Sequence, residues 1–166
     1  MRTIIAMLIM VPGVALAQTT QENILNCLDT LIGQEEIGNG LCQGLVDNVL
    51  EWNVDYDHER YGVAPTGEKV YEIRFKKDKA KVKGENIQPG DVFVIINVFF
   101  TFKYNTGLCV SHTGFVYEVH EDGSFTIVHQ NINSSDRTRN GKIVTDVYSF
   151  DMMSGDNGSI AFYRPE

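Results

Sequence analysis

The stretch that decides the fold is Gly38-Asn39-Gly40-Leu41-Cys42-Gln43-Gly44-Leu45-Val46. Its glycines and asparagine predict a turn, and a helical pattern of apolar residues begins directly after it. Cys42 lies in the first turn of this predicted helix, where unpaired backbone N–H groups and the positive end of the helix dipole favour a thiolate. The position suits a cysteine nucleophile. It also suits a buried cysteine that packs as a small apolar side chain, so other parts of the chain must distinguish the two.

The first 17 residues have the pattern of a secretory signal peptide. Arg2 precedes an apolar run over residues 4–16, and the small-x-small pattern Ala15-Leu16-Ala17 predicts cleavage after Ala17. The run is shorter than the roughly 20 residues that a membrane-spanning helix needs. We therefore expect a secreted or periplasmic protein with residues 18–166 as one domain and with no stable membrane insertion after cleavage.

The charge of the chain argues against a nucleic-acid partner. The formal net charge is −8 for 166 residues, which makes binding to nucleic acid or to anionic lipid unfavourable. One basic cluster departs from this average and predicts a solvated strand face or an exposed loop. Its members are Arg74, Lys76, Lys77, Lys79, Lys81 and Lys83.

Three cysteines follow the predicted signal peptide, at Cys27, Cys42 and Cys109. Export to an oxidising compartment favours a disulfide, and the odd number leaves one thiol over. If Cys42 is the working thiol, Cys27 and Cys109 form the pair. The other pairings and three reduced thiols stay open as alternatives.

Apolar periodicity predicts two helices followed by a series of strands. The helices are expected over residues 20–32 and 41–52, and an irregular loop over 53–67. The strands are expected over 68–75, 92–100, 109–119, 124–129, 143–150 and 159–163, with a hairpin turn at 121–123. The run over 92–100 is almost continuously apolar, as in a strand buried on both faces. Helices followed by mostly antiparallel strands indicate an α+β fold.

Catalysis by a cysteine also needs a histidine base and a polar group that holds the imidazole. His58 and His120 have polar neighbours in the sequence, which predicts surface positions. His112 begins an apolar strand and His129 ends the next one, so the hairpin brings His112 close to His129 and Asn131. A single histidine there is more simply a half-buried strand residue. Two on paired strands, beside a polar Asn131, favour a functional site.

Three more motifs follow the Cys42 stretch in the chain. They are Gln88-Pro89-Gly90-Asp91-Val92, Ser111-His112-Thr113-Gly114-Phe115-Val116 and Ile127-Val128-His129-Gln130-Asn131. In this order they resemble CHAP domains, the cysteine, histidine-dependent amidohydrolases/peptidases related to the NlpC-type and papain-like cysteine peptidases. The resemblance runs over residues 37–132. It rests on the order and spacing of the motifs, because each motif is short.

This resemblance implies a papain-like α+β fold with N-terminal helices packed on a mostly antiparallel β-sheet. It makes Cys42 the nucleophile and His112 the general base, with no metal and no cofactor. Many CHAP domains have an acidic third residue, whereas this chain has His129 there, which resembles the NlpC-type relatives; Asn131 is the alternative. The backbone N–H of Cys42, with Asn39, is expected to bind the oxyanion.

The resemblance also suggests a substrate, because family members often cut peptidoglycan. We expect a secreted amidase or endopeptidase that acts on amide bonds of peptidoglycan or of a related peptide. One alternative is a zinc hydrolase with Cys42, His112 and His129 as ligands, although the chain has no closely spaced pair such as His-x-x-x-His. Another is a catalytically inactive secreted binding module, which would explain the missing acidic third residue.

Overall fold

The computed structural model describes residues 19–54, 67–76, 79–84, 86–102, 105–132 and 136–166. The predicted signal peptide and most of the expected loop over 53–67 lie outside these residues. The helices are α1 (Thr20–Leu31) and α2 (Cys42–Asn53), and two short 3-10 helices are η1 (Arg137–Arg139) and η2 (Phe150–Met152). The strands are β1 (Glu68–Lys76), β2 (Lys79–Gly84), β3 (Val92–Phe102), β4 (Asn105–Val119), β5 (Phe125–His129), β6 (Val144–Tyr148), β7 (Met153–Ser154) and β8 (Ser159–Arg164).

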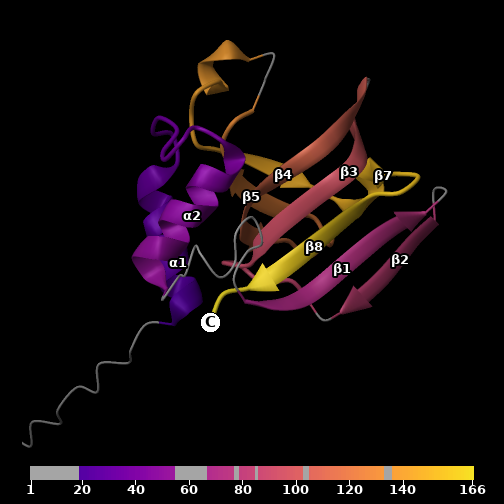
Figure 1. Ribbon diagram of the computed structural model, residues 1–166, viewed down its shortest axis with the longest axis horizontal. Coiled ribbons are helices and arrows are strands. Elements are labelled where there is room, and N and C mark those ends of the chain that lie inside the picture. The colour runs from indigo at the N-terminus through magenta and orange to yellow at the C-terminus, as the bar shows by residue number, and fades with distance from the viewer. Residues whose placement is uncertain (1–18, 55–66, 77–78, 85, 103–104, 133–135) are drawn as a thin grey trace, which may run out of the picture.

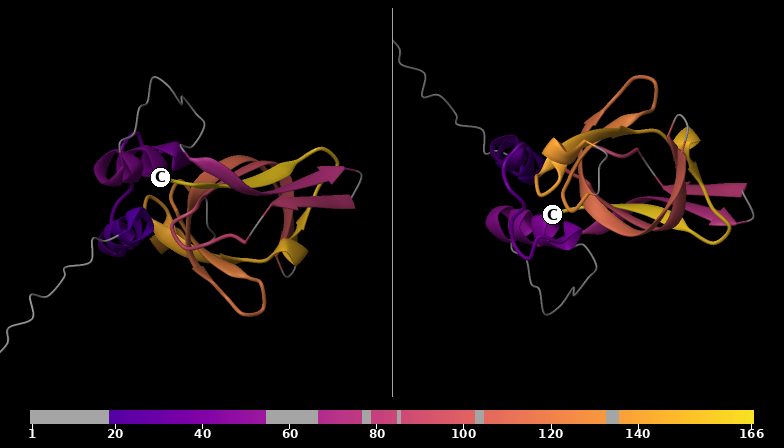
Figure 2. Two further views of the ribbon diagram at one scale, coloured as in Figure 1. Left: turned by 90° about the horizontal axis from the view of Figure 1, so that it is seen from below. Right: turned by 90° about the horizontal axis from the view of Figure 1, so that it is seen from above.

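The strands form one antiparallel sheet with the order β2-β1-β8-β3-β4-β5-β6, and β7 pairs with β3. The sheet curls into a barrel-like shape, seen end-on in Figure 2. Both helices lie on one side of it, away from the β1–β2 hairpin (Figure 1). The predicted α+β fold, with N-terminal helices on a mostly antiparallel sheet, is therefore confirmed.

The helices form where their sequence signals predict. Thr19 caps α1 with a capping box, in which its hydroxyl accepts from the Glu22 N–H and the Glu22 carboxylate accepts from the Thr19 N–H. Apolar side chains at helical spacing bury one face of each helix, for example Leu28 of α1 and Leu45 of α2. No helix among the described residues is long and apolar enough to span a membrane.

The buried apolar side chains form two clusters, one on each face of the sheet. The first lies between the helices and the sheet and includes Phe115 and Val128. The second is enclosed by the curved sheet and contains stacked and edge-on aromatic rings, with Phe125 and Phe162 at its centre. The sheet is thus covered on both faces near β4 and β5, the strands that carry the two candidate histidines.

Strand β3 is buried on both faces at its start, where Val92 and Phe93 belong to different clusters, but beyond Ile95 it breaks the simple alternation of a strand, so the prediction of burial on both faces holds for its first residues only. Ile95 and Val98 are fully buried, whereas the two residues between them are exposed. Asn97 has a φ of 51°, a left-handed conformation that non-glycine residues seldom adopt. Successive inward side chains are therefore three residues apart. Their partners on β4 are His112 and Cys109, which keep the same spacing.

The described members of the basic cluster lie on the outer strands of the sheet, and Lys77 lies outside the described residues. Arg74 of β1 pairs with Lys81 of β2, Glu72 pairs with Lys83, and Arg74, Lys81 and Lys83 are exposed. The cluster is therefore a solvated strand face, one of the two forms that the sequence predicts. Lysines at the edge of a sheet deter pairing with a strand of another molecule.

The three cysteines all lie in the described part of the chain and all are free thiols. Cys27 packs against the cluster between the helices and the sheet. Cys109 packs against the cluster enclosed by the sheet. The predicted disulfide between Cys27 and Cys109 is therefore wrong, because the two side chains belong to clusters on opposite faces of the sheet.

Candidate active site

Cys42 is the first residue of α2, and its side chain is partly exposed. The turn before it uses Gly38 and Gly40 with φ values of 65° and 74°, a conformation that costs glycine little. Asn39 holds this turn, since its side-chain oxygen accepts a hydrogen bond from the Leu41 N–H at 3.0 Å. The N-cap residue Leu41 makes no side-chain cap hydrogen bond. The helix start thus presents the thiol beside backbone N–H groups, as the sequence predicts.

A buried glutamine ties this turn to the end of β5. Gln130, directly after His129, is fully buried. Its side-chain oxygen accepts from the Ile37 N–H at 3.0 Å. Its amide nitrogen donates to the carbonyl oxygens of Ile37 and Leu41, at 2.9 and 2.6 Å. The residue before Cys42 is therefore fixed against the residue after His129.

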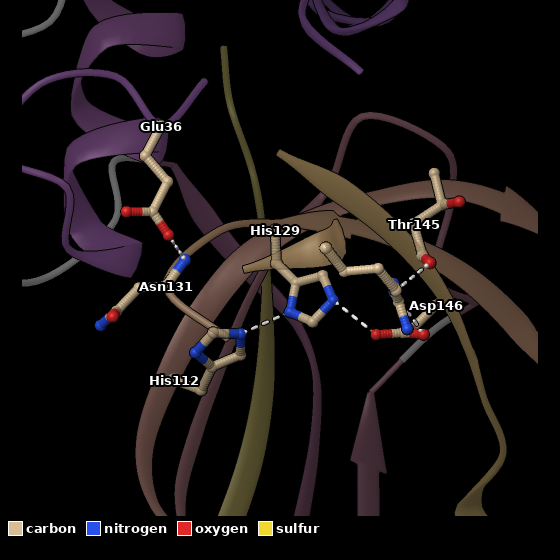
Figure 3. Close-up of polar contacts among 7 residues, drawn as sticks. Glu36, His112, His129, Asn131, Thr145 and Asp146 are labelled. Atoms are coloured by element: carbon tan, nitrogen blue, oxygen red, sulfur yellow. Dashed lines mark hydrogen bonds and ion pairs between the residues drawn. The ribbon is translucent and has the colours of Figure 1, made fainter. Parts of the chain in front are cut away.

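Asn131 supports the same junction through its backbone. It has a φ of 60°, and its N–H donates to the Glu36 carboxylate at 2.7 Å (Figure 3). The hydrogen-bond partner of the His112 ring is His129 and not Asn131. Of the two residues that the sequence offers for the third position, the geometry thus favours His129.

The two histidines belong to a row of hydrogen-bonded side chains (Figure 3). His112 Nε2 lies 2.7 Å from His129 Nδ1, and the rings meet edge to face with centroids 4.9 Å apart. His129 Nε2 lies 2.9 Å from Asp146 Oδ2. Arg139 Nη2 donates to Asp146 Oδ1 at 2.8 Å and to the Thr145 carbonyl oxygen at 2.9 Å. The row therefore joins β4, β5, β6 and η1.

The sequence reasoning missed Asp146 and Arg139. In the sheet, β5 pairs with β6 so that Ile127 lies opposite Asp146 and His129 opposite Val144. In the sequence, Asp146 directly follows Thr145 in the strand expected over 143–150, and a carboxylate there most simply faces solvent. Only the register of β6 against β5 identifies Asp146, because it places this carboxylate diagonally across from His129.

The electrostatic surroundings keep His112 neutral and Asp146 charged at pH 7. Burial, reinforced by His129, lowers the pKa of His112 to about 4, although Asp146 acts in the opposite direction. Burial raises the pKa of Asp146, but hydrogen bonds from His129 and Arg139 outweigh it and leave that pKa below its usual value. His112 is therefore a neutral imidazole in the resting site, with a lone pair that can accept a proton.

Burial, and to a smaller extent Cys42, raises the pKa of Cys109 to about 11. Cys109 lies on β4 three residues before His112, and its side chain packs against the cluster enclosed by the sheet. The described residues include no hydrogen bond between the Cys42 thiol and His112. Catalytic hydrogen bonds are often long in the absence of substrate, so this leaves the pairing open.

The zinc alternative finds no support in the described part of the chain. No group of three His, Cys, Asp or Glu side chains there has the arrangement of a metal site. Both ring nitrogens of His129 are already in hydrogen bonds.

A cavity of about 650 Å³ lies elsewhere, lined by the starts of α1 and β1 and by residues 164–166, and includes none of the candidate site residues.

The α+β fold, with two N-terminal helices packed on a curved antiparallel sheet, is that of a papain-like cysteine proteinase. More particularly, the chain belongs to the AIM3/BBC1 cysteine proteinase-fold domain family, which it matches over residues 14–166. This membership supports a hydrolase in general and does not name a bond or a substrate.

Comparison with individual proteins adds little. The crystal structure of the wild type endolysin LysIME-EF1 is similar, with 19% sequence identity and a TM-score of 0.47. The match covers 87% of this chain and 64% of the endolysin chain. No curated protein matches the chain.

Proposed function

We propose that this protein is a CHAP-like cysteine amidohydrolase or peptidase, with Cys42 as nucleophile, His112 as general base and His129 as the residue that orients it. The observation that carries the proposal is the 2.7 Å contact between His112 and His129 at the end of β5. Gln130 ties the turn before Cys42 to that end. The cysteine proteinase fold of the family supports it.

The proposed reaction begins with a neutral imidazole at His112. His112 takes the thiol proton while the sulfur of Cys42 attacks the amide carbonyl carbon. The backbone N–H of Cys42 donates to the oxyanion, for which Asn39 remains the predicted second contact. The C–N bond breaks as His112 returns the proton to the leaving amine. His112 then deprotonates a water, which attacks the thioester, releases the carboxylic acid and restores the thiol.

The proposed substrate is an amide bond in peptidoglycan or in a related peptide outside the cell. The signal-like pattern of residues 1–17 supports export, and the resemblance of the motifs to CHAP domains supports the wall polymer. Peptide stems carry both the carbonyl carbon that a thiolate attacks and the amine that leaves.

The decisive experiment compares wild type with Cys42→Ala on purified peptidoglycan, with released fragments analysed by mass spectrometry. We expect wild type to release fragments with new amino and carboxyl ends, and Cys42→Ala to release none. Cys27→Ala is the matched control and should behave as wild type, because Cys27 packs against the helix cluster. Identical product profiles for wild type and Cys42→Ala would exclude wall hydrolysis by this thiol.

A second candidate is a peptide-binding module without catalysis. The observation that favours it is the lack of a hydrogen bond between Cys42 and His112 among the described residues. This module would bind stem peptides with the same Kd in wild type and Cys42→Ala. It would also leave Cys42 no more reactive to iodoacetamide at pH 7 than an ordinary thiol.

A further inference from the structure

The hydrogen-bonded row of the site extends two residues beyond the histidine pair. Asp146 contacts the ring of His129 on the side opposite His112, and Arg139 contacts the other oxygen of the same carboxylate (Figure 3). Neither residue belongs to the motifs that resemble CHAP domains. Both side chains are about a third exposed, whereas His129 is almost fully buried. The row thus connects a buried imidazole to a charged pair at the surface.

The chemistry of the groups fixes the direction of each hydrogen bond. Arginine has donors and no acceptor, and an ionised carboxylate has acceptors and no donor. His129 Nε2 must therefore carry the hydrogen in its contact with Asp146 Oδ2. In the neutral ring, Nδ1 of His129 is then an acceptor. It accepts from His112 Nε2, so Nδ1 of His112 carries the free lone pair.

We propose that Asp146, oriented by Arg139, is a positioning residue that sets the tautomers of both histidines and leaves Nδ1 of His112 unprotonated. The catalytic meaning rests on the proposed function, in which this nitrogen takes the thiol proton. The tautomers themselves do not depend on it. The acidic partner that His129 replaces at the third position is thereby present one residue further along the row.

The Asp146 carboxylate also stabilises the positive charge that His112 gains when it takes the proton. An imidazolium at His112 would lie one ring away from Asp146, and Asp146 already opposes the lowering of the His112 pKa. His129 can pass this stabilisation on because it accepts from His112 and donates to Asp146 in the same state. A neutral residue at position 146 removes this stabilisation of the charged His112.

The sharpest variant is Asp146→Asn, because Arg139 determines how the new amide lies. Arg139 donates to position 146, so the amide oxygen faces Arg139 and the NH2 group faces His129. The NH2 group donates to His129 Nε2, which inverts both tautomers and puts the hydrogen of His112 on Nδ1. A similar carboxylate-to-amide change in the serine protease triad lowers kcat about 10⁴-fold through the wrong tautomer. We expect a fall of about 10²–10⁴-fold in fragment release.

Removing Arg139 from the Asp146→Asn variant should restore the original tautomers of both histidines. In Arg139→Ala with Asp146→Asn, the amide can turn its oxygen toward His129, which restores the original tautomers. We expect this double variant to be at least tenfold more active than Asp146→Asn alone. A merely structural Asp146 predicts the opposite, since losing both partners would then harm the protein more than losing one.

Nitrogen-15 NMR of the histidine side chains at pH 7 reads the tautomers without any substrate. We expect His112 to be protonated at Nε2 in wild type and in Cys42→Ala, at Nδ1 in Asp146→Asn, and at Nε2 again in the double variant. Asp122→Asn, which replaces an exposed carboxylate bonded to Ser124, is the matched control and should leave the tautomers of His112 and His129 unchanged.

The outcomes separate this inference from the proposed function. Protonation of His112 at Nδ1 in wild type would overturn the inference, and this measurement needs no variant that might unfold. An unchanged His112 tautomer in folded Asp146→Asn would overturn it too. The expected tautomers without any hydrolysis by wild type would support the inference and count against the proposed function.

Discussion

His112 gives folding a pH dependence at the scale of a single residue. Burial, and then His129, lower its pKa from 6.5 to about 4 in the folded protein. Between these values the unfolded chain binds this proton and the folded chain does not. Above pH 6.5 this histidine is neutral in both states and has no effect on stability. As the pH falls from 6.5 toward 4, the free energy of unfolding decreases by up to about 1.4 kcal/mol per pH unit.

Urea unfolding at several values between pH 4.5 and pH 7 measures this slope. We expect the free energy of unfolding of wild type to fall with decreasing pH and that of His112→Gln to fall less steeply. Asp146 does not obscure this window. Burial raises its pKa, but hydrogen bonds from His129 and Arg139 bring it below 3.8, so its contribution is lost only at lower pH. Equal slopes in both proteins would contradict the prediction.

Residue type and local pattern were enough to select Cys42, His112 and His129 as candidates, because Cys42 begins a predicted helix and the two histidines lie on strands that a predicted hairpin joins. Asp146 and Arg139 could not be selected in this way. Their role depends on the pairing of β6 with β5 and on the turn through η1, and neither is encoded by a local pattern. The roles of residues in such a row of hydrogen bonds can be inferred only when the strand register is known.

At the scale of elements, Gln130 is the contact that holds the start of α2 against β5. Its side chain makes three hydrogen bonds to the backbone of Ile37 and Leu41, and it is fully buried. Gln130→Leu removes all three bonds and takes from the Ile37 N–H its Gln130 acceptor, whereas the Ile37 and Leu41 carbonyl oxygens keep the N–H groups of Gly40 and Gly44; we expect a cost of about 1–3 kcal/mol of unfolding free energy. It should also lower the rate of Cys42 alkylation or catalysis, because the turn before the thiol loses its anchor.

Gln88→Leu is the matched control for that experiment, since the side chain of Gln88 is exposed. We expect it to change the unfolding free energy by less than about 0.5 kcal/mol. Chemical denaturation and iodoacetamide kinetics on the two variants test both effects. Equal behaviour of the two would show that the junction does not depend on the buried glutamine.

The helices and the β4–β5 hairpin could be predicted closely from the sequence, because their periodicity and turn residues are local signals. The break in strand alternation at Asn97 could not. It depends on Gly158 in the loop before β8, where an added Cβ would lie 2.1 Å from the carbonyl oxygen of Asn97. The conformation is thus set by a contact between distant parts of the chain.

This contact predicts that Gly158→Ala is strongly destabilising, because backbone atoms have to move to make room. We expect a loss of about 1–3 kcal/mol in the free energy of unfolding. Gly107→Ala is the matched control, since an added Cβ there meets nothing within 4 Å. Thermal and urea unfolding compare the two. A Gly158→Ala protein as stable as Gly107→Ala would mean that β3 does not need this close approach.

At the scale of the molecule, the sequence predicted the α+β class and the order of the two helices and six of the strands, but not β2, β7 or the path of the sheet. Strand β8 lies between β1 and β3, so the last strand of the chain joins its first and third strands. Local patterns favour pairing of neighbours in sequence and give no sign of such an insertion. The interaction that fixes it is also non-local, between Asp91 at the start of β3 and Arg164 at the end of β8.

Asp91 and Arg164 form a two-pronged ion pair, with Nε to Oδ1 and Nη2 to Oδ2 both at 3.0 Å. Asp91 is fully buried and also accepts from the Gln88 N–H at 2.8 Å, which gives the Gln-Pro-Gly-Asp motif a structural role. Burial raises the pKa of Asp91, and the bonds from Arg164 and Gln88 oppose that rise. The carboxylate is therefore tolerated in the interior only while its partner is present.

Arg164→Met should consequently cost about 3–5 kcal/mol of unfolding free energy at pH 7, because it leaves a buried carboxylate without its counter-charge. The loss should shrink as the pH is lowered, since protonation removes the uncompensated charge of Asp91. Lys69→Met is the matched control. It breaks the exposed contact of Lys69 with Glu72 at 3.0 Å and should cost less than about 1 kcal/mol. Equal losses in the two variants, or a loss independent of pH, would show that the closure of the sheet does not rest on this pair.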